Sequence, residues 1–151
     1  SSAYGYLFLK NINSNNDHIL NVSKEIRNYF DTKDYEVFAM GDMAGKASYL
    51  LERRFIQLEG LVSGKGMINR INQQENLCSV FEDYKVQIYL TASPKKIKNI
   101  YFVQEPHQLS QNVKKMQGKI IGEPYKIFTS PDSDLKIFSF NFENGKNKCI
   151  Y

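Results

Sequence analysis

A glycine-rich turn at residues 41–48 is the first feature of the chain whose residue types suit an anion. It reads Gly41-Asp42-Met43-Ala44-Gly45-Lys46-Ala47-Ser48 and lies between a predicted strand and a predicted helix, as phosphate-binding loops do. Three residues separate its two glycines, whereas the nucleotide-binding loop needs four, and Ser48 follows the lysine one position late. The pattern favours an ordinary strand-to-helix turn with Asp42 at the positive end of the helix dipole, while the free amides there leave anion binding as an alternative.

Two acidic side chains are expected at one edge of the predicted sheet. Asp42 follows the strand predicted at 36–40, and Glu59 with Gly60 ends the strand predicted at 55–59. The carboxyl ends of parallel strands form the usual ligand edge of an open α/β sheet. Two carboxylates there could act as acid and base or bind a cation, or they could cap helices and pair with Lys46 or Lys65. We expect no metal and no cofactor. The candidate ligand-binding residues are Gly41, Asp42, Gly45, Lys46, Glu59, Gly60 and Lys65.

The other reactive residues do not form a catalytic pattern. His107 follows Pro106 with Glu105 beside it, but the GxSxG motif of serine hydrolases does not occur in the sequence. Cys78 lies in an apolar helical stripe, and Cys149 lies close to the last residue. Two cysteines without a CxxC pair fit a buried thiol and a tail thiol better than a zinc site, with a single disulfide as the alternative.

The composition and net charge of the chain exclude some classes of binding partner. The 151 residues are 42% hydrophobic and 24% charged, which is typical of a globular domain, and no apolar run approaches the roughly 18 residues of a membrane helix. Residues 1–75 carry nine basic and nine acidic residues, so the net charge of +4 comes from residues 76–151, with eleven Lys, no Arg and seven acids. Nucleic-acid readers use Arg forks and dense basic stripes, so we expect no nucleic-acid partner. The run Lys95-Lys96-Ile97-Lys98 suits a solvated strand edge, with an anionic lipid surface as the alternative.

Apolar periodicity predicts alternating helices and strands before residue 92. The stripe that begins with Ile19 and Val22 and ends with Phe30 predicts a helix from about residue 17. Strands are predicted at 36–40, 55–59 and 86–90, and helices at 44–51, 67–71 and 77–84. This alternation is typical of βαβ units with parallel strands.

After Pro94 the pattern changes to antiparallel strands separated by Pro and Gly turns. These strands are predicted at 100–103, 119–121, 125–129 and 135–141, and residues 143–151 are expected to form a flexible tail. We therefore predict one α/β domain over residues 1–151. Its core is a small three-layer Rossmann-like sheet of parallel βα units at about 36–91, extended by the antiparallel C-terminal strands.

Three segments of the chain resemble a known family. Val37–Gly45 is a strand that ends in Gly-Asp with a further Gly, Phe55–Val62 is a strand that runs into acid-Gly-Leu-Val, and Tyr84–Tyr89 opens the third strand. This order resembles the C-terminal soluble domain of polytopic membrane glycosyltransferases of the polyprenyl-phosphate-sugar type and their uncharacterised relatives. The resemblance covers residues 17–92, and Glu59 stands where the group often has Asp.

The resemblance implies an accessory role. The catalytic acids of that family lie in loops between membrane helices, so no catalytic residue carries over and we expect this domain to be non-catalytic by itself. Its expected place is the extracytoplasmic, periplasmic face of a bacterial inner membrane, as part of a longer membrane protein, with residues 1–3 as a non-native remnant. The expected partners are its own transmembrane region and a glycan or polyprenyl-phosphate sugar, on which tyrosines such as Tyr49 or Tyr84 could stack.

Two alternatives belong to other functional classes. A stand-alone α/β enzyme would bind a nucleotide or a phosphate at Gly41–Lys46. A protein-interaction module would bind no small ligand and would dock through the apolar segment Tyr4–Leu9.

Overall fold

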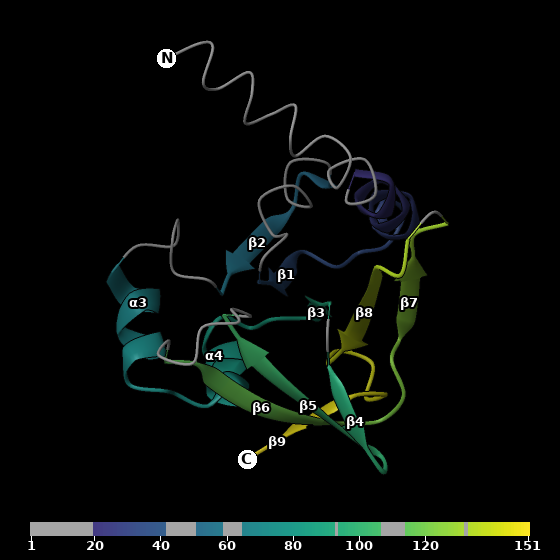
Figure 1. Cartoon of the computed structure of the whole chain (residues 1–151). Helices are drawn as coiled ribbons and strands as arrows, with labels where there is room; N and C mark the ends of the chain where they lie inside the picture. The colour runs from purple at the N-terminus through teal and green to yellow at the C-terminus, as the bar shows by residue number, and fades with distance from the viewer. Residues whose placement is uncertain (1–19, 42–50, 59–64, 93, 107–113, 132) are drawn as a thin grey trace, which may run out of the picture.

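The architecture consists of two β-sheets with short helices around them. The computed structural model describes residues 20–41, 51–58, 65–92, 94–106, 114–131 and 133–151. Within these ranges nine strands form two sheets, which we call sheet A and sheet B (Figure 1). The structure is mostly β, and the predicted Rossmann-like α/β fold is therefore wrong.

Sheet A has five strands in the order β2-β1-β3-β8-β7. β1 (Val37–Met40) pairs in parallel with β2 (Arg54–Gln57) and with β3 (Ile88–Thr91). β8 (Lys136–Asn141) runs antiparallel to both β3 and β7 (Lys126–Thr129). Parallel pairing in the described residues is thus confined to three short strands.

Sheet B explains why the predicted fold is wrong. Its strands lie in the order β4-β5-β6-β9 and all pair antiparallel. They are β4 (Lys95–Ile97), β5 (Ile100–Glu105), β6 (Met116–Ile121) and β9 (Lys148–Ile150). Four of the six strands after Pro94 therefore form a second sheet instead of extending the first, and this sheet covers a face on which a Rossmann-like fold would place crossover helices.

Two apolar clusters cover the two faces of sheet A. On one face, Phe38 of β1 and Ile88 of β3 pack with the helical residues 20–30, which contribute Val22, Ile26 and Phe30 at a spacing of four. The other cluster lies between sheet A and sheet B and also contains apolar residues of α3 (Lys65–Asn72) and α4 (Leu77–Asp83). Figure 1 shows the purple helix above sheet A and the strands of sheet B below it.

Helix α4 packs closely on β6. Its first turn is capped by Asn76, whose side-chain oxygen accepts a 2.8 Å hydrogen bond from the backbone N–H of Cys78. A Cβ atom at Gly118 would lie 3.0 Å from Cβ of Leu77, so the missing side chain lets the helix approach the strand. No helix in the described residues is both long and apolar enough to cross a membrane.

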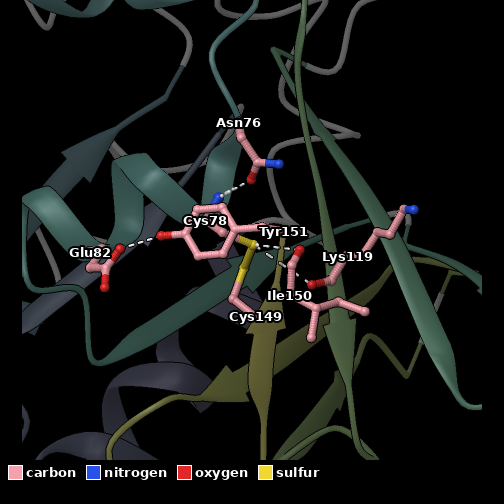
Figure 2. The surroundings of a disulfide bond; sticks show 7 residues. All are labelled: Asn76, Cys78, Glu82, Lys119, Cys149, Ile150 and Tyr151. Carbon is pink, nitrogen blue, oxygen red and sulfur yellow. Dashed lines mark hydrogen bonds between the residues drawn. A yellow bond between two sulfur atoms is a disulfide. The ribbon is translucent and has the colours of Figure 1, made fainter.

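Residues 143–151 contain a strand, not the flexible tail that we expected. β9 pairs with β6, and Cys149 of β9 forms a disulfide with Cys78 of α4, 71 residues earlier in the chain, with Cα atoms 5.6 Å apart (Figure 2). The expectation of a buried thiol at Cys78 and a tail thiol at Cys149 is therefore wrong, and the alternative of a single disulfide is the one that the structure shows. The hydroxyl of Tyr151 donates a hydrogen bond to Glu82, which raises the pKa of Tyr151.

Candidate functional site

The predicted ligand edge is described only in part. Gly41 directly follows β1, and Lys65 begins α3, where only its backbone is described. The structure therefore places two members of the predicted set. The other predicted ligand-binding or reactive residues lie outside the described residues, namely Asp42, Gly45, Lys46, Glu59, Gly60, Tyr49 and His107.

A buried carboxylate lies against Gly41. Glu105, the last residue of β5, is 2% exposed, and the Tyr89 hydroxyl donates a 2.8 Å hydrogen bond to its Oε1. A Cβ atom at position 41 would collide with Oε2 of Glu105, so this approach requires glycine. The sequence singled out Glu105 only as the neighbour of His107, because nothing local indicates that β5 ends beside β1.

A hollow at the opposite edge of sheet A forms a more complete candidate site. The register pairs Phe38 with Ile88, Ile88 with Asn141, and Lys126 with Ser139, so the starts of β1, β3 and β7 lie beside the end of β8. The segments around these strand ends border an open hollow of about 470 Å³, which we call the tyrosine pocket. It is lined by Thr32, Lys33, Asp34, Tyr35, Gln87, Tyr125 and Glu143.

The aromatic rings at this pocket are held in place by other rings. The ring centroid of Tyr125 lies 6.3 Å from that of Tyr35 and 5.9 Å from that of Tyr29, with edge-to-face geometry in both pairs. Buried rings support them from the core, since Phe128 lies 5.5 Å from Tyr29 and Phe30 lies 6.2 Å from Tyr35. The half-buried tyrosines therefore present rings whose orientation is already fixed.

Hydrogen bonds fix the polar side chains of the pocket. The side-chain oxygen of Gln87 accepts from the backbone N–H groups of Glu36 at 2.8 Å and Val37 at 3.1 Å. Nδ2 of Asn141, itself fully buried, donates a 2.7 Å hydrogen bond to the hydroxyl of Tyr35. The pocket thus joins β1, β3 and β8 through side chains as well as through the sheet.

The two lining tyrosines have pKa values raised by burial. Burial raises the pKa of Tyr35, and the hydrogen bond from Asn141 opposes this rise. Burial also raises the pKa of Tyr125, and its hydrogen bond with Tyr29 adds to the rise. An ordinary tyrosine is already protonated at neutral pH, and the raised pKa values leave both phenols as uncharged hydrogen-bonding groups there.

Lysine side chains surround these rings. Lys33 Nζ lies 4.4 Å from the ring centroid of Tyr29, and Lys126 Nζ lies 5.3 Å from it. Lys146 Nζ lies 5.9 Å from the ring centroid of Tyr125. Together with the lining carboxylates of Asp34 and Glu143, they place charges of both signs around aromatic faces.

Tyr84, the described tyrosine that the sequence analysis named, does not line the tyrosine pocket. Tyr84 ends α4 and is half-buried, and the Arg70 guanidinium lies 5.4 Å from its ring centroid. Sequence analysis missed Tyr35 and Tyr125 as site residues. The available signal was their place at strand starts, since Tyr35 directly precedes the strand predicted at 36–40 and Tyr125 begins the strand predicted at 125–129, but only the strand pairing brings the two together.

Neither a metal-binding cluster in the described residues nor a related protein helps to assign the site. The described residues contain no group of three or more His, Cys, Asp or Glu side chains that could hold a metal ion. Comparisons with models of protein families, with curated proteins and with solved structures found no match for this chain.

Proposed function

We propose that this chain is a non-catalytic accessory domain of a membrane glycosyltransferase-like protein, and that its tyrosine pocket holds a glycan. The proposed role is to position an acceptor glycan or the sugar of a lipid-linked donor for chemistry performed elsewhere in the parent protein. The resemblance of residues 17–92 to the soluble domains of such transferases supports the parent class.

The observation that carries the proposal is the set of groups in the tyrosine pocket. A pyranose ring has apolar C–H faces and a rim of hydroxyl groups, so it needs an aromatic surface beside donors and acceptors of hydrogen bonds. Tyr35 and Tyr125 provide rigid rings with neutral hydroxyls, and Asp34, Gln87 and Thr32 line the same hollow.

The disulfide supports the extracytoplasmic placement. Cys78 and Cys149 are bonded to each other, and such bonds persist mainly in oxidising compartments such as the bacterial periplasm. A domain that acts on the outer side of a bacterial inner membrane would meet this condition.

The test is an NMR titration of the 151-residue chain with neutral oligosaccharides, sugar nucleotides and ATP. We expect an oligosaccharide to shift the amide signals of Tyr35, Gln87 and Glu143, with a dissociation constant on the order of millimolar. Tyr125→Ala should abolish these shifts because it removes one ring face. Tyr84→Ala is the matched control, since this tyrosine lies outside the pocket, and should leave them unchanged.

Other outcomes would replace the proposal. Binding of ATP or a sugar nucleotide that shifts Gly41 instead of the pocket would favour the stand-alone enzyme. A folded sample that responds to none of the ligands would favour a protein-interaction module. Equal loss of binding in Tyr125→Ala and Tyr84→Ala would remove the tyrosine pocket as the site.

A further inference from the structure

The outer face of sheet B is the second surface of the molecule that suggests binding. Side chains alternate between the two faces along β5 and β6, with Tyr101, Val103 and Ile120 buried toward sheet A. The strand register then assigns the other set to the outer face. Its members are Lys95, Ile97, Ile100, Phe102, Gln104, Gln117, Lys119, Ile121, Lys148 and Ile150.

This face combines exposed apolar side chains with lysine. Ile97 is 46% exposed, and Phe102, Ile121 and Ile150 are half-buried although they point away from the core. A hollow of about 420 Å³ lies on the face, and both Phe102 and Lys119 line it. Large apolar side chains gathered on a solvent-facing sheet surface indicate that this surface contacts another protein or a membrane.

The charge on this face is entirely positive. The lining of the hollow includes Lys95 and Lys119 but no acidic residue. Among the described residues, neither lysine takes part in an ion pair, whereas Lys96, on the opposite face of β4, pairs with Glu123 at 3.1 Å. The uncompensated lysines therefore attract a negatively charged surface.

We propose that the outer face of sheet B docks on an anionic phospholipid bilayer. Four strands spaced by about 4.8 Å make a surface roughly 14 Å wide, which spans more than one lipid headgroup. Lysine side chains reach phosphates flexibly, while Ile97 and Phe102 can enter the interface between headgroups and acyl chains. A peptide partner fits less well, because phosphopeptide and acidic-motif sites use Arg forks and residues 76–151 contain no Arg. This inference does not rest on the glycan-binding proposal, since the face lies on the other sheet.

Vesicle co-sedimentation of the 151-residue chain tests the proposal. One set of vesicles contains phosphatidylcholine alone, and the other contains phosphatidylcholine with phosphatidylglycerol. We expect binding to the anionic set only, weakening as salt is added. The double variant Lys95→Glu/Lys119→Glu should bind about 25-fold more weakly or worse, because each lysine near an anionic leaflet contributes about a factor of five.

The matched control reverses two exposed lysines elsewhere. Lys24→Glu/Lys136→Glu makes the same change in net charge in the helix of residues 20–30 and in β8, and should bind as the unmodified chain does. Equal weakening in both double variants, or equal binding to both sets of vesicles, would overturn the proposal. Binding of inorganic phosphate in NMR without vesicle binding would overturn it as well, by indicating a soluble phosphate ligand. Circular dichroism of both variants checks that they are folded, and the salt titration tests the charge dependence without any variant.

Discussion

Sheet A and sheet B use their residues in different ways. All four residues of β3, in the middle of sheet A, are buried, and apolar clusters cover both faces of this sheet. In sheet B only one face is buried, and all three residues of the edge strand β4 are exposed. In sheet A the surfaces open to ligands are therefore at the ends of the strands, where Gly41 and the tyrosine pocket lie. Sheet B instead exposes one broad face. We infer that a small ligand and a broad surface would meet different sheets of this molecule.

The largest expected effect comes from removing the disulfide that ties β9 of sheet B to helix α4. The double variant Cys78→Ser/Cys149→Ser should lower the free energy of unfolding by about 4 kcal/mol, because the bond closes a loop of 71 residues in the unfolded chain. Urea unfolding measures this loss, and adding a reductant to the double variant, as a control, should change nothing further. Hydrogen exchange should accelerate more in β6 and β9 than in β1 and β3. Equal acceleration in both sheets would mean that the two sheets unfold as one unit.

A smaller effect should separate the two faces of sheet B. Ile120 and Ile121 are neighbours in β6, but Ile120 is fully buried and Ile121 lies on the outer face. Ile120→Ala should lower the free energy of unfolding by about 3 kcal/mol through lost burial and a cavity. Ile121→Ala is the matched substitution and should lower it by less than about 1 kcal/mol. Similar losses in urea unfolding would show that something covers the outer face.

The smallest effect concerns the edge of sheet A at high pH. The pKa values of Tyr35 and Tyr125 are raised in the folded state above the ordinary 10.0. The folded state therefore holds these protons more tightly, so the resulting stability is complete below pH 10.0 and is lost as the pH rises through the raised values. We expect the Tm to fall above pH 10.0, and to fall less steeply in Tyr35→Phe/Tyr125→Phe.

Thermal unfolding across this pH range measures the difference in slope. Tyr101→Phe, in sheet B, serves as the control and should follow the unmodified chain. A double variant whose Tm falls as steeply as that of the unmodified chain would contradict the role assigned to burial of the two phenols.

Local patterns predicted most of the individual elements, but not how they associate. The strand predicted at 36–40 is β1, that at 135–141 is β8, and the helix predicted at 77–84 is α4. Their periodicity depends on neighbouring residues, so the sequence alone reveals it. The pairing of strands depends on residues far apart in the chain. The alternation of buried and half-buried residues along β5 would be the same whether β5 joined sheet A or belonged to a second sheet. The fold class was wrong for this reason.

The C-terminal strand and the tyrosine pocket were not predicted for the same reason, namely that both depend on residues far apart in the chain. Residues 143–151 are polar and short, so nothing local distinguishes β9 from a tail, and only β6 and Cys78 define it. The Gly41 turn was predicted from glycine and charge, yet the buried Glu105 beside it comes from β5. Tyr35 and Tyr125 are 90 residues apart and meet only through the order of β1, β3, β8 and β7. Spatial sites of this kind become visible once the sheet order is known.

The bond between Cys78 and Cys149 also determines how the molecule carries mechanical load. A pull applied between residue 20 and residue 151 would pass from Cys149 directly to Cys78, because the covalent bridge joins them. The 70 residues between the two cysteines, with β3 to β8 among them, lie outside this covalent path and cannot be drawn out while the bond is intact. Reduction would add roughly 240 Å of extensible chain to the same pull. The disulfide thus limits how far a force on the last residues can extend the chain, because Tyr125 and most of the strands lie inside the closed loop.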